Sequence, residues 1–248
     1  MSQPSEVQSF LRHLSDERQL SPNTVTAYEK DLEDLQEFLT SFTGTPAWTW
    51  VDVDRLSLRG FMGWCRRKGL SRRTVGRKLS ALRTFFRFLH LEGRIESNPA
   101  RAIRAPKRER HLPGHLSRSG VEALFDLAEG RAAKNALKGT RDLVILELLY
   151  GSGLRLSELH GLDLDHLDLA GDQVRVRGKG RKDRIVPLTR ASVVAVRRYE
   201  PRRREALASA AASDASSRDR RALLVNARGR RLSRRGIQGV VRDLLDRA

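Results

Sequence analysis

Apolar residues recur at helical spacing in the first third of the chain. One stripe begins after Ser21 and Pro22, which suit the N-cap and first turn of a helix, and a second lies between the cap Ser71 and the stop Gly93. The first stripe comprises Val25, Tyr28, Leu32, Leu35 and Leu39, and the second comprises Val75, Leu79, Leu82, Phe86 and Leu89. This spacing predicts two amphipathic helices that bury these faces.

A further helix, ending at Gly69, is predicted between them, after a loop whose Trp48 and Trp50 are expected to anchor the core. Residues 1–105 are therefore predicted to form a helical domain. Residues 106–115 are predicted to be a basic linker, because their prolines and glycine interrupt helices and their charges favour solvent.

The spacing changes in the rest of the chain. Helices are predicted in residues 117–133 and 139–162, the second apolar enough to be central to a core. In residues 172–188, Val174 and Val176 alternate with arginines, a Gly-Lys-Gly turn follows, and apolar residues resume at Ile185 and Val186, a pattern typical of a β-hairpin. Residues 203–222 are interpreted as a helix end that leads into a surface loop.

The last stretch predicts a short strand, a turn and a helix capped near Ser233. Residues 116–248 are therefore predicted to be an α+β domain. The whole chain is expected to be mainly α, with a small antiparallel hairpin or sheet.

The net charge of the chain indicates which kind of partner it binds. The 248 residues include 48 Lys and Arg against 30 Asp and Glu, a net charge of +18. Such an excess favours a polyanion, because cations that neutralise phosphates release condensed counterions. Aromatic residues make up only 6%, which argues against a stacking platform for single strands and favours double-stranded DNA. An arginine-rich surface that is merely solvated remains the alternative.

Other classes of protein are disfavoured. The chain contains no apolar run of membrane length and no export signal at its start, so we expect a cytoplasmic protein without a membrane partner. Its single cysteine, Cys65, is unable to form an internal disulfide or a Cys-x-x-Cys metal site. No metal and no other cofactor is expected.

Basic residues line the polar face of the helix that follows Ser71. This face is a candidate for contact with the DNA backbone or the major groove, and the same spacing fits a solvated helix surface. The candidate DNA-binding residues are Arg72, Arg73, Arg77, Lys78 and Arg83, with Arg87 on the same face.

Two side chains are candidates for chemistry on a phosphodiester. Arg155 follows Gly-Ser-Gly at the start of a predicted helix, where its guanidinium suits the charge on non-bridging phosphate oxygens. Glu158 lies on the same helical face and is placed to orient Arg155. Lys179, at the hairpin tip, is suited to protonate a leaving oxygen. The alternatives are an ordinary surface Arg–Glu pair and a solvated turn lysine.

Five stretches, in chain order, resemble the tyrosine recombinase (phage integrase) family, of the bacterial XerC/XerD type. They are LSPNTVTAYEKDLEDLQEFL (20–39), LSRRTVGRKLSALRTFFRFLHLEGRIESNPA (70–100), LPGHLSRSGVEALF (112–125), LLYGSGLRLSELHGLDLDHLDL (148–169) and VRVRGKGRKDRIVPL (174–188). The resemblance covers nearly the whole chain, and the pairing of GSGLRLSEL with RGKGRKDRIVPL is highly specific for the family.

The resemblance implies a SAM-like core-binding domain followed by the start of a catalytic domain. Arg155 looks like the first catalytic arginine, Glu158 like its supporting acid and Lys179 like the hairpin lysine. It also implies a metal-free reaction: a tyrosine attacks the scissile phosphate, forms a 3′-phosphotyrosyl link and is displaced by the 5′-hydroxyl of the partner strand. Four protomers on two DNA sites carry this out, commonly to resolve chromosome dimers before cell division.

The sequence departs from the family pattern after the hairpin. We find no later His-x-x-Arg and no tyrosine in a nucleophile context, since Tyr28, Tyr150 and Tyr199 all lie where packing is favoured. The His-x-x-Arg at 115–118 precedes Arg155 and is not equivalent to the family motif. Four aspartates alternate with leucines in a pattern that favours a turn and a strand edge over metal ligands: Asp163, Asp165, Asp168 and Asp172.

The catalytic domain is therefore expected to be incomplete, lacking the nucleophile and the second arginine. We expect this chain to bind DNA without cleaving it, because no covalent intermediate forms without a nucleophile. An interrupted recombinase and a non-catalytic, sequence-specific DNA-binding protein at recombination sites are the two main hypotheses. A generic basic nucleic-acid binder is disfavoured by the ordered run of five stretches.

Overall fold

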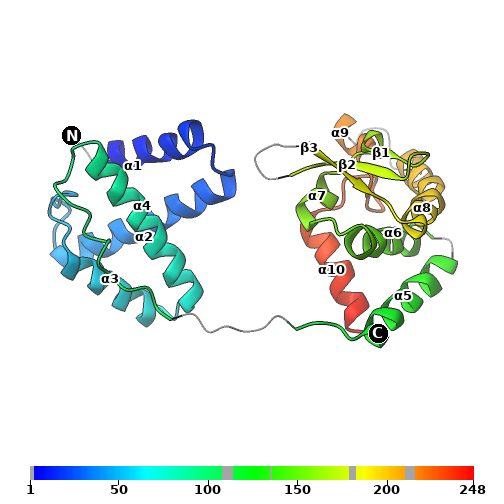
Figure 1. Cartoon of the computed structure of the whole chain (residues 1–248), viewed down its shortest axis with the longest axis horizontal. Helices are drawn as coiled ribbons and strands as arrows, with labels where there is room; N and C mark the ends of the chain where they lie inside the picture. Colours follow the sequence, from blue (N-terminus) through cyan, green and yellow to red (C-terminus); the bar gives the residue numbers. More distant parts are fainter. Residues whose placement is uncertain (1–2, 108–113, 135, 179–182, 210–215) are drawn as a thin grey trace. The chain divides into compact units, whose positions relative to one another are not determined.

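The protein is described by a computed structural model covering residues 3–107, 114–134, 136–178, 183–209 and 216–248. It contains two compact units, Met1–Leu112 and Pro113–Ala248 (Figure 1). Lys179 lies outside the described residues. No helix among the described residues is long and apolar enough to cross a membrane.

The first unit is helical, as predicted. Its elements are α1 (Gln3–Arg12), a π-helical turn η1 (His13–Glu17), α2 (Pro22–Thr43), α3 (Arg55–Arg67) and α4 (Arg72–Leu91). Ser21 and Ser71 are confirmed as N-caps, because their hydroxyls accept the backbone N–H groups of Thr24 and Thr74. Gly93, expected to stop α4, has a φ of 65°, a left-handed conformation that favours glycine.

The core of this unit is rich in aromatic side chains. The predicted anchors Trp48 and Trp50 are both buried, and the ring of Trp50 lies edge-on to that of Phe85 at 4.7 Å between centroids. All five predicted apolar residues of α4 are buried, whereas Tyr28 and Val25 of α2 are only partly buried. Both amphipathic helices are thereby confirmed.

The second unit combines helices with a small sheet (Figure 1). Its elements are α5 (Arg118–Ala133), α6 (Leu137–Leu146), the π-helical turn η2 (Glu147–Gly151), α7 (Leu156–Gly161), the 3₁₀ turn η3 (Leu164–His166), β1 (Leu167–Asp168), β2 (Gln173–Arg177), β3 (Asp183–Pro187), α8 (Arg190–Ser209), α9 (Ser217–Arg221) and α10 (Arg234–Leu245). The three strands are antiparallel in the order β1-β2-β3.

The hairpin register determines which side chains face the core. Val174 lies opposite Val186 and Val176 lies opposite Arg184, so these four share one face of the sheet. Val174 and Val176 are buried, as is nearly all of α6, which confirms that α6 is central to this core.

Two sequence-based interpretations need correction near the chain's end. Within residues 203–222, α9 is a separate helical turn that begins with a capping box between Ser216 and Asp219. The predicted strand before the last turn is reduced to one bridge, between Val225 and Arg231. Ser233 is confirmed as the N-cap of α10, accepting the N–H of Gly236.

Candidate nucleic-acid interface

Arg155 is the N-cap residue of α7, where the sequence placed it. The preceding Gly153 has a φ of 64°, which lets the chain turn sharply between η2 and α7. The side chain of Arg155 is 72% exposed. Its guanidinium therefore lies at the surface, at the start of a helix that is packed on its other side against the core.

Glu158 lies beneath Arg155, with only 3% of its side chain exposed. Its Oε1 accepts from Arg155 Nη1 at 2.9 Å, and its Oε2 accepts from the backbone N–H of Arg155 at 2.9 Å. The pair of Arg155 and Glu158 is therefore only half at the surface, because the arginine is exposed and the carboxylate is buried. The two side chains lie in contact, as the sequence predicted.

Arg184, on β3, is a site residue that sequence reasoning missed. Its Nη1 and Nη2 donate to Glu158 Oε1 and Oε2 at 2.7 and 3.0 Å, a bidentate pair. The hydrogen bond from Arg184, followed by those from Arg155, lowers the pKa of Glu158 to about 2 despite its burial. The available signal was strand alternation, which places Arg184 on the inward face with Val174 and Val176 and so requires a buried partner.

The C-terminal end of α7 is also fixed. Arg231 donates through Nη1 to the carbonyl oxygens of His160 and Leu162, at 2.9 and 3.0 Å, and through Nη2 to the carboxylate of Asp163. These bonds satisfy carbonyls that the short helix leaves open. Helix α7 is thus attached to the rest of the unit at both ends.

The predicted basic face of α4 is divided by the structure. Arg72, Arg73 and Arg77 are exposed, but Lys78 is buried, and its Nζ donates to Asp31 Oδ1 at 2.9 Å and to Asp34. Burial alone would lower the pKa of Lys78, and its bonds to Asp34 and Asp31 raise it overall. The prediction that Lys78 lies on the outer face is wrong, because this ammonium joins α4 to α2.

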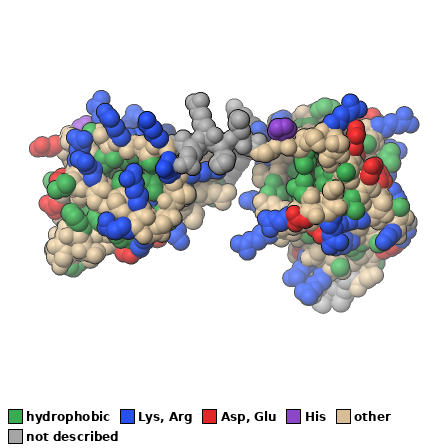
Figure 2. Space-filling model, turned by 90° about the horizontal axis from the view of Figure 1, so that it is seen from below, with side chains coloured by type: hydrophobic (Ala, Val, Ile, Leu, Met, Phe, Trp, Pro, Cys, Tyr) green, Lys and Arg blue, Asp and Glu red, His purple; other side chains and the backbone are tan. Residues whose placement is uncertain are grey.

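Two other arginines of α4, Arg77 and Arg83, also donate hydrogen bonds to groups of the same unit. Arg77 donates through Nη1 to the carboxylate of Asp31 and to the Ala27 carbonyl at 3.1 Å. Arg83, half-buried, donates to the Ala100 carbonyl at 3.3 Å and to the Ile103 carbonyl, which holds the segment after α4 against that helix. Exposed basic side chains nevertheless remain prominent on the face of each unit shown in Figure 2.

The three tyrosines occupy the packing environments expected of them. Tyr199 is fully buried, its hydroxyl accepts the Val225 N–H at 3.0 Å, and burial raises its pKa. Tyr150 is 65% exposed, with its ring against Phe125 at 5.6 Å between centroids. Tyr28 lies in the first unit, stacked on Phe10.

The aspartate-rich stretch forms the turns and strand edge that its pattern predicted. Asp168 is in β1 and accepts from Gln173 Nε2 at 2.9 Å and from the Gly171 N–H at 2.8 Å. Ligand atoms of Asp163, Asp165 and His166 lie within 4.8 Å of one another. The Asp163 carboxylate in this group is already paired with an arginine, as described above.

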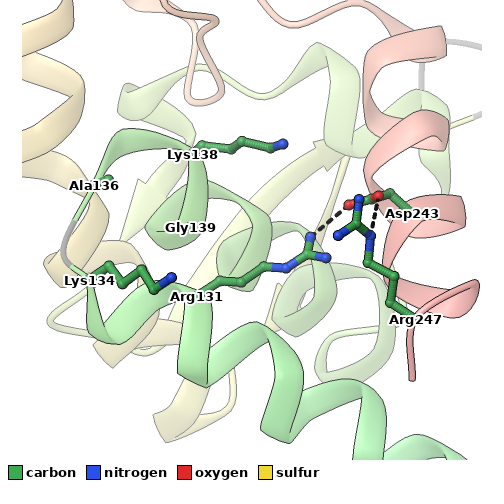
Figure 3. Close-up of a pocket in the computed structure, with 7 residues that line it drawn as sticks. All are labelled: Arg131, Lys134, Ala136, Lys138, Gly139, Asp243 and Arg247. Atoms are coloured by element: carbon green, nitrogen blue, oxygen red, sulfur yellow. Dashed lines mark hydrogen bonds and ion pairs between the residues drawn. The ribbon is translucent and has the colours of Figure 1, made fainter.

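A second basic region lines a cavity of about 280 Å³ between the ends of α5, α6 and α10 (Figure 3). Asp243 accepts there from Arg131 Nη1 and Arg247 Nε, both at 2.8 Å. Lys134 and Lys138 also line the cavity. The cross-helix pair of Arg131 and Asp243 fastens α10 to α5, so this cluster has a structural role.

Comparisons with known proteins cover both units. Residues 7–93 match the family described as phage integrase, N-terminal SAM-like domain, and residues 115–248 match the phage integrase family. Among solved structures, a lambda integrase dimer bound to a COC′ core site is similar with a TM-score of 0.65, at 14% identity over 99% of this chain and 81% of that one. That likeness concerns the fold.

Sequence relatives are more similar. A tyrosine recombinase XerC of Pelobacter propionicus is 39% identical over 95% of this chain and 72% of its own length. Those of Alcanivorax borkumensis and Escherichia coli O1:K1 are 40% and 38% identical, over 94% of this chain and 70% and 72% of their own lengths. With these relatives and both family matches, the chain belongs to the phage integrase family of tyrosine recombinases.

Proposed function

We propose that this protein binds double-stranded DNA at a recombination site and takes part in site-specific recombination, in the cytoplasm. The observation that carries the proposal is Arg155: an exposed guanidinium held by the buried Glu158, in a chain of the tyrosine recombinase family. A guanidinium fixed in this way offers preorganised donors to the non-bridging oxygens of a phosphodiester.

The roles of the individual residues belong to the same proposal. In the family's cleavage reaction, residues at these positions would bind the scissile phosphate (Arg155), orient its guanidinium (Glu158) and protonate the leaving 5′-oxygen (Lys179). Arg72 and Arg73, exposed on α4, contact the DNA backbone of the core-binding half-site. Protomers on two DNA sites assemble as a tetramer for strand exchange.

For the 248-residue chain itself, we infer DNA binding without strand cleavage. The buried hydroxyl of Tyr199 and the stacking of Tyr28 on Phe10 support this inference, because a nucleophile must reach the phosphate. Tyr150 is 65% exposed and is therefore the tyrosine that the experiment must test directly. The roles we infer for this chain are therefore DNA recognition and phosphate binding.

The test is incubation of the purified chain with a nicked, labelled recombination-site duplex. A gel shift without a covalent protein–DNA band is expected, and Arg155→Ala should weaken the shift. A covalent band would contradict the inference about cleavage, and its loss in Tyr150→Phe would identify the exposed tyrosine as the nucleophile. Failure to bind any duplex would overturn the proposed function as a whole.

A further inference from the structure

The carboxylate of Glu158 is fully occupied. Each of its oxygens accepts two donors: Oε1 from the side chains of Arg155 and Arg184, and Oε2 from the Arg155 backbone N–H and Arg184. Four donors match the four lone-pair positions of an ionised carboxylate. No position is left on Glu158 for a second contact from Arg155.

The two guanidiniums are used differently. Arg184 gives both of its Nη groups to Glu158, whereas Arg155 gives one Nη group and has no other side-chain partner among the described residues. Its remaining N–H donors therefore face solvent. This division leaves Arg155, and not Arg184, available for a phosphate.

Loss of the Arg184 fork would change this arrangement. Two lone pairs of the buried, ionised Glu158 carboxylate would lose their hydrogen-bond donors, and a buried acceptor without a donor costs free energy. Arg155 is the nearest described cation, already bound at one point, and a bidentate pair is the favoured geometry for Arg and carboxylate. Arg155 would turn towards Glu158 and away from the surface.

We propose that Arg184 is a positioning residue, which saturates Glu158 and thereby keeps the guanidinium of Arg155 directed outward for a DNA phosphate. Arg184 also ties β3, which follows Lys179 in the sequence, to the start of α7. The phosphate part of this inference rests on the proposed function, whereas the orientation of Arg155 does not.

The first measurement is the affinity of the 248-residue chain for a short random duplex as a function of salt, because phosphate contacts do not depend on sequence. Variants are Arg155→Ala, Arg184→Lys, the double variant, and Arg204→Met. Lysine retains the charge of Arg184 but lacks its fork. Arg204, exposed on α8 and paired with Glu200, is the control for lost charge.

The slope of log K against log salt is negative, and we expect Arg184→Lys and Arg155→Ala each to reduce its magnitude by about 0.9 and to weaken binding about eightfold at 0.1 M salt. The double variant should bind no more weakly than Arg155→Ala, because Arg184 acts through Arg155. Arg204→Met should keep the wild-type slope. Wild-type binding by Arg184→Lys, or additive losses in the double variant, would overturn the proposal.

A second measurement needs no DNA. The side-chain NMR signal of Arg155, assigned by its loss in Arg155→Ala, should show slower guanidinium rotation in Arg184→Lys, as in a bidentate pair. An unchanged signal would contradict the positioning role even if the wild-type chain fails to bind duplex DNA. If circular dichroism shows that Arg184→Lys is unfolded, Arg184→Gln is measured in the same way, with the same two outcomes.

Discussion

Replacement of Glu158 by glutamine should destabilise the second unit in a pH-dependent way. The pKa of Glu158 falls from an ordinary 4.5 to about 2 in the folded chain. Each tenfold change in acidity is worth about 1.4 kcal/mol, so the charged form contributes about 3 kcal/mol. Because Arg184 is partly exposed and water screens the pair, we expect a loss of about 2 kcal/mol at pH 7 in Glu158→Gln.

The direction in which the stability contributed by Glu158 changes with pH follows from its lowered pKa. A carboxyl group that is more acidic when folded stabilises the fold fully above about pH 4.5, and this contribution disappears as the pH falls towards 2. The difference between the wild-type chain and Glu158→Gln should therefore be constant from pH 7 to about 5.5 and fall to about half by pH 3. The amide of the variant does not titrate in this range.

Urea unfolding between pH 7 and pH 3 measures this difference, and the chain provides its own control. Its three tryptophans, Trp48, Trp50 and Trp64, all lie in the first unit, so their fluorescence follows that unit alone. Circular dichroism or amide exchange follows the second unit. A difference between wild-type and variant that does not change with pH would refute the reasoning, as would a shift of the fluorescence transition.

Three further variants, with Gly130→Ala as a control, test the packing. Lys78→Met should destabilise the first unit by about 3 kcal/mol in urea unfolding followed by fluorescence, because it leaves a buried carboxylate with one fewer cation. Gly139→Ala should lower the melting temperature of the second unit, since its Cβ would lie 2.2 Å from a carbonyl oxygen of α5, whereas Gly130→Ala, with open space, should not. Tyr199→Phe should cost about 1–3 kcal/mol by removing the acceptor of the buried Val225 N–H, and an unchanged midpoint would contradict that bond's importance.

Local patterns in the sequence were sufficient for most helices and for the hairpin. Caps such as Ser21, Ser71 and Ser233 act within one turn, and a buried stripe is set by spacing alone, so both are visible without tertiary structure. The turn α9 was missed because its capping box lies in a compositionally biased stretch. Strand β1 was expected only as a strand edge in the aspartate-leucine stretch, because two residues are too short to show a period of their own.

The state of each cation was not predictable in this way. On helical spacing, Lys78 looks like a member of the same face as Arg73, and only the approach of α2 shows that an aspartate lies beneath it. Arg184 was overlooked for the converse reason, since its partner Glu158 is distant in sequence. Strand alternation indicates that Arg184 faces inward, but the identity of its partner depends on how α7 packs against β3, which spacing within one strand does not encode.

The net charge of +18 therefore overstates the surface available to a polyanion. Lys78 and Arg184 each neutralise a buried carboxylate, and Arg231 binds an aspartate and two carbonyls at the end of α7. These cations stabilise the fold. They affect DNA binding by positioning other side chains more than by contributing charge to the surface. Since Arg155 is fixed by a carboxylate that Arg184 saturates, a substitution that preserves charge but changes shape is the one that separates positioning from simple electrostatic attraction.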